Sequence, residues 1–179
     1  MKFSTKSSKI TYEGRAFSVS QDQVQLPDGG TTTLDIVHHS GAVTIVPVDG
    51  DGNMWFVRQY RHAAGKVMLE LPAGTLEDNE DPRQCAIREL QEEIDMSARK
   101  MAPLGSFYMV PGYSTEFMHV FLATDLYPSS LPEDDNEFLE VEKMPVQQVY
   151  ALARAGEIDD AKTLAALTLA QPKLEAYLA

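Results

Sequence analysis

Residues 71–96 read LPAGTLEDNEDPRQCAIRELQEEIDM, and the rest of the chain is organised around this stretch. Its first half is rich in Gly, Asp and Asn, which is typical of a turn, and its second half has the apolar spacing of a helix. Asp81 is a good N-cap residue, and the fixed φ of Pro82 suits the first position of a helix. We therefore predict a turn that passes into a helix at Pro82.

The predicted helix carries three glutamates on one face. On a helical wheel of about 100° per residue, Glu92 and Glu93 lie within about 60° of Glu89. The apolar residues cluster about 100° to 160° from Glu89, so a core face lies beside the carboxylate face. Close like charges repel on a helix, and a bound divalent cation such as Mg²⁺ would remove this repulsion. A solvated surface face is the alternative, and the glutamates alone do not decide between the two.

The spacing of the charged residues favours the metal-binding alternative. Gly74 is followed after five residues by Glu80, and seven further residues separate Glu80 from Arg88. The six positions of the pattern are Gly74, Glu80, Arg88, Glu89, Glu92 and Glu93. At average usage they should recur by chance in about one chain of this length in a hundred thousand. The pattern resembles the Nudix box, the signature of the Nudix hydrolase superfamily.

Asp95 departs from this pattern, because the box normally has glycine at that position. A glycine that closes a helix usually takes a left-handed conformation, which Asp tolerates better than most residues. We expect the fold to survive at a modest cost. An extra carboxylate near the metal ions could alter their affinity.

Four stretches outside or overlapping the box resemble the ADP-ribose pyrophosphatase branch of the superfamily. They are RQYR at 58–61, ELPAG at 70–74, PGYSTE at 111–116 and GEIDDAKT at 156–163. In that branch a proline follows the box by about fifteen or sixteen positions, and here Pro111 stands 15 positions after Met96.

The predicted elements are strands around one central helix, with helices at the end of the chain. Strands are expected at 9–12, 16–26, 31–39, 42–48, 54–60, 67–71, 101–110, 117–124 and 138–143. Helices are expected from Pro82, at 145–155 and at 159–170, and an acidic loop at 127–136. This pattern favours an α+β class, an α/β/α sandwich. The resemblance implies the Nudix fold, a mixed sheet between helices with an N-terminal β-strand extension. Residues 1–40 would form the N-terminal strand region and 41–179 the catalytic domain.

The resemblance implies a metal site on the carboxylate face. Glu89, Glu93 and the carbonyl of Ala73 would bind metal, and Glu92 would bind a second ion or its water. Glu92 and Glu116 are the predicted catalytic residues, with Glu116 orienting or deprotonating the attacking water. The alternative for Glu116 is a solvated loop carboxylate.

The other predicted site residues support the box or bind substrate. Gly74, Glu80 and Arg88 are structural, with Glu80 and Arg88 as an ion pair that holds the loop against the helix. Substrate contacts are predicted for Arg61 and Glu70, with a surface ion pair as the alternative. The adenine base requires an aromatic face, for which Phe17, Tyr113 and Tyr12 are candidates. For Phe17 and Tyr12 the alternative is packing in the core.

The implied activity is hydrolysis of ADP-ribose to AMP and ribose 5-phosphate, with two or more Mg²⁺ or Mn²⁺ ions. One alternative is another nucleoside diphosphate sugar such as GDP-mannose, and a second is a non-catalytic nucleotide-sensing module. The resemblance also implies a homodimer formed through the N-terminal strands, where the partner completes the base pocket. The N-terminal residues have few apolar side chains, which agrees with this expectation.

Composition indicates a globular protein without nucleic-acid or membrane partners. The chain has 179 residues, 44% of them hydrophobic, enough for one domain with a sizeable core. The net charge of −12 argues against non-specific binding to nucleic acid or anionic membranes. No apolar run approaches the roughly 20 residues of a membrane span. Cys85 is the single cysteine, which we expect to be a packing residue in a cytoplasmic protein.

Overall fold

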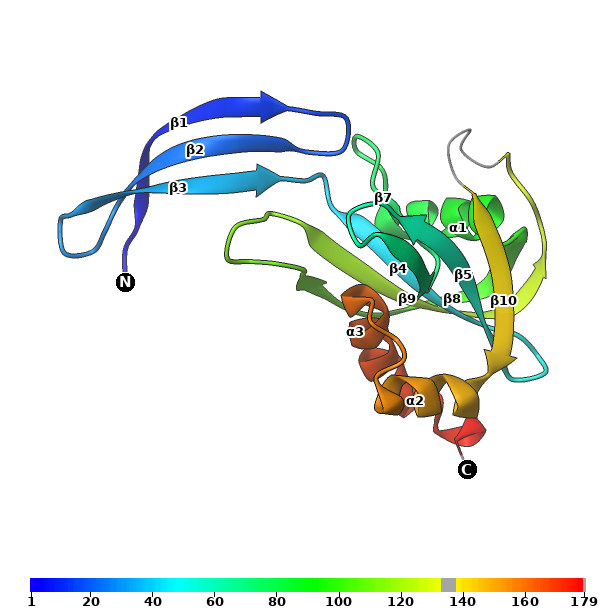
Figure 1. Cartoon of the computed structure of the whole chain (residues 1–179). Coiled ribbons are helices and arrows are strands. Elements are labelled where there is room, and N and C mark those ends of the chain that lie inside the picture. Colours follow the sequence, from blue (N-terminus) through cyan, green and yellow to red (C-terminus); the bar gives the residue numbers. More distant parts are fainter. Residues whose placement is uncertain (133–137, 179) are drawn as a thin grey trace. The chain divides into compact units, whose positions relative to one another are not determined.

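Three antiparallel strands form the N-terminal part of the protein. In the computed structural model, which describes residues 1–132 and 138–178, they pair in the order β1-β2-β3 (Figure 1). Their bounds are β1 Ser4–Glu13, β2 Ser18–Gln25 and β3 Thr31–His38. At the turn between β2 and β3, Gly29 has a φ of 89° and Leu26 N–H donates to Gly30 O over 2.8 Å. This turn joins two of the predicted strands, those expected at 16–26 and 31–39, into a hairpin.

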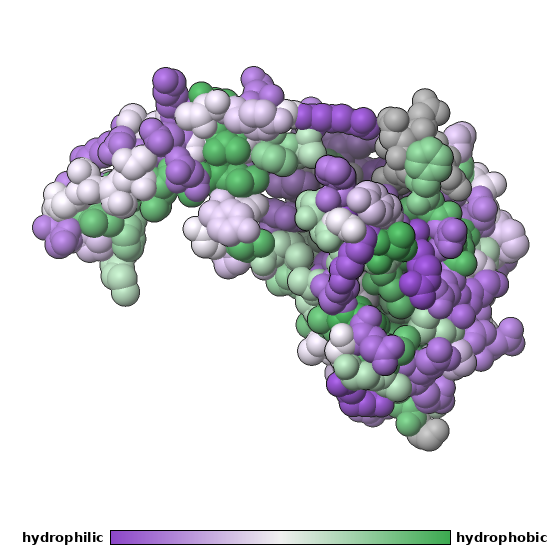
Figure 2. Space-filling model, in the orientation of Figure 1, coloured by the Kyte–Doolittle hydropathy of each residue, from purple (hydrophilic) through white to green (hydrophobic). Residues whose placement is uncertain are grey.

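The first of two compact units consists of Met1–Gly41 together with Phe107–Phe117. Val37 joins the two segments, because its N–H donates to Tyr113 O over 2.8 Å and its carbonyl accepts from Thr115 N–H over 2.9 Å. Every residue of β1 is exposed, and Val24 is the one buried apolar residue among those described in this unit. Figure 2 shows apolar side chains on the surface of these strands. The unit therefore has little apolar core of its own.

The second compact unit, Ala42–Ser106 with Met118–Ala179, is built on a seven-stranded sheet. Its strands are β4 Ala42–Val48, β5 Asn53–Arg61, β6 Lys66–Glu70, β7 Ala73–Thr75, β8 Met96–Tyr108, β9 Phe117–Pro128 and β10 Leu139–Pro145. The order across the sheet is β10-β5-β4-β9-β8, while β6 pairs with β5 and β7 with β4. Strand β4 is parallel to β9 but antiparallel to β5 and β7. The sheet is mixed, as predicted.

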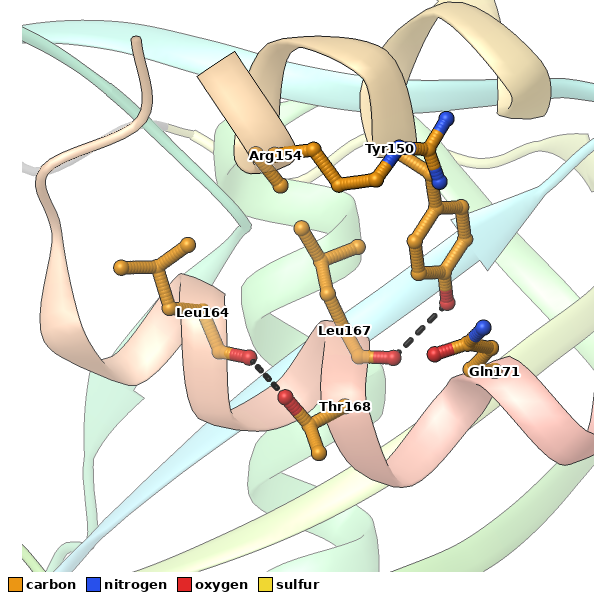
Figure 3. A pocket seen from close by; sticks show the side chains of 7 residues that line it. Tyr150, Arg154, Leu164, Leu167, Thr168 and Gln171 are labelled. Carbon is orange, nitrogen blue, oxygen red and sulfur yellow. Dashed lines mark hydrogen bonds between the residues drawn. The ribbon is translucent and has the colours of Figure 1, made fainter. Parts of the chain in front are cut away.

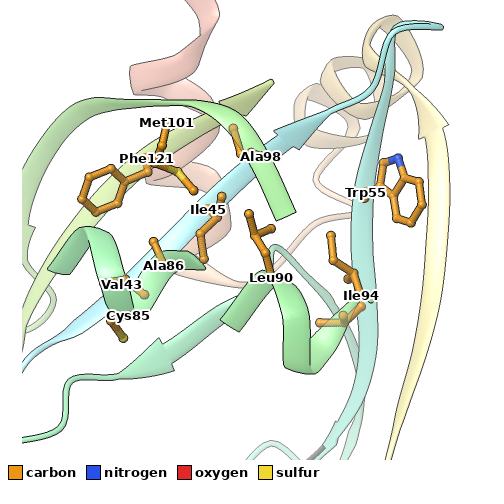
Figure 4. Packing of buried hydrophobic residues seen from close by; sticks show 12 residues of the cluster. Val43, Ile45, Trp55, Cys85, Ala86, Leu90, Ile94, Ala98, Met101 and Phe121 are labelled. Carbon is orange, nitrogen blue, oxygen red and sulfur yellow. The ribbon is translucent and has the colours of Figure 1, made fainter. Parts of the chain in front are cut away.

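Helices cover both faces of the central strand β4. They are α1 Pro82–Glu93, α2 Val146–Ala155 and α3 Ala161–Ala170, followed by two short 3₁₀-helices at Gln171–Lys173 and Glu175–Tyr177. All seven residues of β4 are buried, and successive side chains of a strand alternate between its two faces. Val43 and Ile45 pack with Cys85, Ala86 and Leu90 of α1 (Figure 4), and α3 also packs against β4. The helix–sheet–helix arrangement confirms the α+β class, and Cys85 is a packing residue.

Two strands begin well before their predicted starts, whereas β5 and β6 begin only one residue early. β1 starts at Ser4 rather than Lys9, because pairing with β2 and not burial makes this polar segment a strand. β8 starts at Met96 rather than Met101, because Asp95 in a left-handed conformation leads the chain from α1 directly into the strand. The first residues of β1 and β8 lack the apolar pattern by which a strand is predicted from sequence.

The predicted starts of the last two helices and the acidic loop also need correction. α2 and α3 begin one and two residues later than predicted, since Pro145 and Asp160 are their N-cap residues. The predicted loop at 127–136 begins later, because β9 continues to Pro128. Its residues 133–136 lie outside the described part of the chain.

Candidate active site

Helix α1 begins and ends as its sequence predicts. The Asp81 side chain accepts hydrogen bonds from Arg83 N–H over 3.0 Å and Gln84 N–H over 3.3 Å, and Pro82 opens the helix. Just past the helix, the exposed Asp95 has a φ of 55°, in the left-handed region. The chain therefore turns at Asp95 in the way that a closing glycine would allow.

Replacing Asp95 by glycine should stabilise the fold. A left-handed conformation is strained for residues with a Cβ, less so for Asp, and glycine removes that strain at some cost in unfolded-chain entropy. We expect Asp95→Gly to raise the free energy of unfolding by about 0.5–1 kcal/mol and Asp95→Ala to lower it by about 1 kcal/mol. Urea denaturation measures both changes. A less stable Asp95→Gly would show that the carboxylate itself supports the turn, and assays of the variant would show whether it affects metal dependence.

Two of the three glutamates are buried against β7. Glu89 is 7% exposed and Glu93 is 5% exposed, and they lie one helical turn apart on α1. The Ala73 N–H donates to Glu93 Oε2 over 3.0 Å. A Cβ at Gly74 would lie 1.8 Å from Glu89 Oε1, so only glycine leaves room for this carboxylate. The structure brings together three predicted metal ligands, Ala73, Glu89 and Glu93, with the structural Gly74 beside them, while metal binding itself stays a prediction.

Arg88 links the box loop to the acidic face of α1. Its Nε and Nη2 donate to the two oxygens of Glu80 over 3.0 and 3.1 Å, which is the ion pair expected from the sequence. Its Nη1 donates to Glu89 Oε1 over 2.6 Å and to Glu92 Oε2 over 2.8 Å. The hydrogen bond to Glu80 raises the pKa of Arg88, against the opposing effect of burial, and the charge of Glu89 raises it further. Arg88 therefore stays charged and offsets part of the repulsion on this face.

The Arg88–Glu80 pair should make stability depend on acid pH. The hydrogen bond from Arg88 lowers the pKa of Glu80 below its ordinary value of 4.5. The pair therefore contributes fully to the free energy of unfolding above about pH 4.5, and this contribution is lost as the pH falls below that value. The side chains are 25% and 15% exposed, so we expect a loss of only about 1 kcal/mol. Urea denaturation measures the free energy of unfolding at pH 7 and at pH 3. The difference between the two values should be smaller for Glu80→Gln than for wild type, whereas the exposed Glu77→Gln should show the wild-type difference. Equal differences in all three proteins would contradict the assignment.

The oxygen donors on this face fit a hard divalent cation. The carboxylates of Glu89, Glu92 and Glu93 and the Ala73 carbonyl are the kinds of ligand that Mg²⁺ and Mn²⁺ take. Within residues 1–132 and 138–178, no three His, Cys, Asp or Glu side chains already form a group that could hold a metal ion. Donors of the protein itself, Arg88 Nη1 and Ala73 N–H, bind these carboxylates instead. The donor set fits the metal, and binding requires these contacts to rearrange.

Arg61 and Glu70 form an ion pair between a partly exposed guanidinium and a buried carboxylate. Arg61 Nε and Nη2 donate to the two oxygens of Glu70 over 2.8 and 2.7 Å, and Lys162 of α3 also donates to Glu70 Oε2. Burial would raise the pKa of Glu70, but the hydrogen bonds from Arg61 and the charge of Lys162 bring it below its ordinary value. The ion pair given as the alternative is therefore present, but Glu70 is 1% exposed, so its carboxylate does not lie at the surface. Contacts of Arg61 and Glu70 with substrate stay predictions.

The remaining predicted residues lie in the first compact unit, whereas α1 lies in the second. Glu116 is half-buried, and its N–H donates to Ser114 Oγ over 3.1 Å. Tyr113 is 54% exposed. Phe17 and Tyr12 are 43% and 55% exposed and their ring centroids are 5.8 Å apart, so the alternative of core packing is wrong for both within the chain. Their roles in binding the base, and the catalytic role of Glu116, stay predictions.

Three residues at the start of α3 have no predicted role but contact this region. Asp160 is the N-cap of the helix, Lys162 contacts Glu70, and the Thr163 hydroxyl accepts a hydrogen bond from Leu71 N–H over 2.9 Å. The available signal was a lysine and a threonine at the beginning of an otherwise apolar helix. Polar residues so placed are candidates for partners of a buried charge.

A cavity of about 270 Å³ lies between α2 and α3, away from the predicted residues (Figure 3). Among the residues around it are Tyr150, whose hydroxyl donates to Leu167 O over 2.7 Å, and Arg154. None of the predicted site residues lines this cavity. It is therefore a separate feature from the carboxylate face.

The chain matches a protein-family model and is similar in sequence to named proteins. A family model described as NUDIX domain matches residues 38–167. An ADP-ribose pyrophosphatase of Bacillus subtilis is 36% identical over 166 residues, which cover 90% of this chain and 89% of the relative. An ADP-ribose pyrophosphatase of Mycobacterium tuberculosis is 42% identical over 136 residues, which cover 75% of this chain and 66% of the relative.

A solved structure supports the same assignment. The crystal structure of an ADP compounds hydrolase superposes with a TM-score of 0.87 at 25% sequence identity, covering 98% of this chain and 96% of that chain. In the described part of the chain, no helix is long and apolar enough to cross a membrane. The family match extends over α1, its glutamates and β7, where the site residues meet. By sequence, fold and the arrangement of its box residues, the chain belongs to the Nudix hydrolase family.

Proposed function

We propose that this Nudix hydrolase cuts the pyrophosphate bond of ADP-ribose, producing AMP and ribose 5-phosphate. The observation that carries the proposal is the buried pair Glu89 and Glu93, which lies against the backbone of Ala73 and Gly74. The names of the two pyrophosphatase relatives support ADP-ribose as the substrate. Acidic side chains buried beside a backbone strand are suited to a reaction that needs divalent cations.

In this proposal, Glu89, Glu92, Glu93 and the Ala73 carbonyl hold Mg²⁺ or Mn²⁺, as two or more ions. When bound, these ions neutralise charge on the two phosphoryl groups and make a water molecule more nucleophilic. Arg88 Nη1, which bridges Glu89 and Glu92 over 2.6 and 2.8 Å, holds the two carboxylates in place before a cation binds. The guanidinium is a rigid plane whose Nε and Nη2 bind Glu80, so the carboxylates of Glu89 and Glu92 turn away from Nη1 when a cation binds.

The proposed chemistry assigns a proton transfer to Glu116 and substrate binding to Arg61. The oxygen of the attacking water bonds to phosphorus while a proton of that water passes to Glu116. The bridging P–O bond breaks, and the second phosphate ester leaves with the bridging oxygen. The Arg61 side chain is 43% exposed although it is forked to Glu70, so its guanidinium can also bind a phosphate or ribose oxygen. Glu70 fixes the orientation of that guanidinium, and a direct contact of Glu70 with a substrate hydroxyl requires it to leave its present partners.

We infer that a homodimer completes the base pocket. The N-terminal unit buries little apolar surface and exposes Tyr12, Phe17 and Tyr113, any of which offers a face for adenine. Residues 1–40 would form the dimer contact and 41–179 the catalytic domain. Sedimentation equilibrium should give twice the chain mass of 19.8 kDa, and a monomer at assay concentration would contradict this part of the proposal. The buried, unpaired thiol of Cys85 supports a reducing, cytoplasmic location.

A substrate panel tests the activity. Purified protein with Mg²⁺ or Mn²⁺ should release AMP from ADP-ribose faster than it hydrolyses GDP-mannose, NADH or diadenosine polyphosphates. A preference for GDP-mannose would keep the chemistry but change the substrate. Binding of ADP-ribose without hydrolysis of any panel member would favour the nucleotide-sensing alternative. EDTA should abolish the reaction, and added Mg²⁺ should restore it.

A further inference from the structure

The segment from Glu70 to Ala73 connects β6 to the metal-binding face. Glu70 ends β6 and Ala73 begins β7, so the two residues between them set where the Ala73 backbone lies. The Ala73 N–H contacts Glu93, and the next residue, Gly74, abuts Glu89. A shift of this segment would therefore move the Ala73 carbonyl relative to both buried glutamates.

The Thr163 hydroxyl holds the middle of this segment through an oriented hydrogen bond. Thr163 Oγ1 donates to Asp160 Oδ2 over 2.6 Å and accepts from Leu71 N–H over 2.9 Å. A hydroxyl has one proton, so the bond to Asp160 directs its lone pairs toward Leu71. Thr163 and Leu71 are both completely buried, and water cannot replace Thr163 as the partner of this amide. On the other side, Pro72 O accepts from Ile45 N–H over 2.9 Å.

The beginning of the segment is held by balanced charges. Glu70 binds Arg61 and Lys162, and Lys162 Nζ also donates to Asp160 Oδ2 over 3.0 Å. Two carboxylates thus face two cations in a region where Glu70 is 1% and Lys162 is 9% exposed. The hydrogen bond to Glu70 is the main cause of the raised pKa of Arg61, and the charge of Glu93 raises it further, so this cluster lies within electrostatic range of the metal-binding face. Loss of one member would leave a buried charge unbalanced.

We propose that Lys162 and Thr163, oriented by Asp160, are positioning residues for the metal site. They act by fixing Glu70 and Leu71, the residues that lead into Ala73. Through this segment, the start of α3 sets the distance of the Ala73 carbonyl from Glu89 and Glu93. This inference rests on the proposed metal-dependent function.

The test compares two threonines of the same helix. Thr163→Val keeps the side-chain shape but removes the hydroxyl that accepts from Leu71, whereas Thr163→Ser keeps it. Thr168→Val is the matched control, because the exposed Thr168 hydroxyl donates only within α3, to Leu164 O over 2.8 Å. Mn²⁺ binding is measured by calorimetry without substrate, and kcat is measured at saturating Mn²⁺. Unfolding temperature is recorded for every variant.

We expect Thr163→Val to weaken Mn²⁺ binding by about tenfold and to lower kcat, at a temperature where the variant is folded. Thr163→Ser should recover most of the affinity, and Thr168→Val should bind Mn²⁺ as wild type does. Should Thr163→Val not fold, Lys162→Gln carries the same test. A folded Thr163→Val or Lys162→Gln with wild-type Mn²⁺ affinity would overturn the proposal, even with a lowered unfolding temperature. Absence of ADP-ribose hydrolysis by wild type would refute the proposed function separately, because metal binding is measured without substrate.

Discussion

Glu93→Gln is expected to lower kcat for ADP-ribose hydrolysis by about 10²–10³-fold while the protein stays folded. Glutamine can still accept the hydrogen bond that Ala73 N–H donates to Glu93 Oε2, so the local packing should survive. What the substitution removes is a negative charge on the metal-binding face. A metal ion contributes several kcal/mol of charge stabilisation in such reactions, and each 1.4 kcal/mol corresponds to a factor of ten.

The control for this prediction is Glu140→Gln, which makes the same chemical change at an exposed position of β10. Its kcat and metal dependence should equal those of wild type. Far-UV circular dichroism and thermal unfolding should show that Glu93→Gln is folded at the assay temperature. Full activity of a folded Glu93→Gln would remove Glu93 from the metal site, and the assignment of Glu89 would then need a new basis.

Gly74→Ala is expected to weaken metal binding strongly for a steric reason. The new Cβ would lie 1.8 Å from Glu89 Oε1 and 1.9 Å from its Cδ, distances at which the carboxylate must leave its position. We expect Mn²⁺ affinity and kcat to fall by about a hundredfold each, since a displaced ligand loses its share of the metal's binding energy. Calorimetry with Mn²⁺ and steady-state rates measure the two effects.

Gly50→Ala is the matched control for Gly74→Ala. A Cβ at Gly50 would meet nothing within 4 Å, and its φ lies outside the left-handed region. This variant should bind Mn²⁺ and turn over as wild type does. If Gly74→Ala retained wild-type Mn²⁺ affinity, the observed position of the Glu89 carboxylate would not be the one that binds metal.

Helix α1 and its caps could be predicted because their signals are local. Asp81 and Pro82 set the first turn of the helix, and Asp95 forms the left-handed turn just past its end. The pair Arg88 and Glu80 was also accessible, since both residues belong to one short pattern of fixed spacing. These features depend on hydrogen bonds between residues that are close in sequence, so a short stretch is enough to reveal them.

The long-range contacts could not be predicted in the same way. Lys162 and Thr163 are each 92 residues from their partners Glu70 and Leu71, and no local pattern relates positions so far apart. Burial of Glu70 was missed for the same reason. An arginine and a glutamate on neighbouring strands can form either a surface pair or an interior one, and the helix packed over them decides which.

The sequence by itself determined that a capped helix presents Glu89, Glu92 and Glu93 on one face, because helical periodicity and capping act over a few residues. It also identified the Nudix family, since the spacing of the box is contained within one stretch. Only the tertiary structure decided that Glu89 lies against Gly74 and Glu93 against Ala73. Those contacts require β7 and α1 to pack on β4 together, and packing depends on the whole chain.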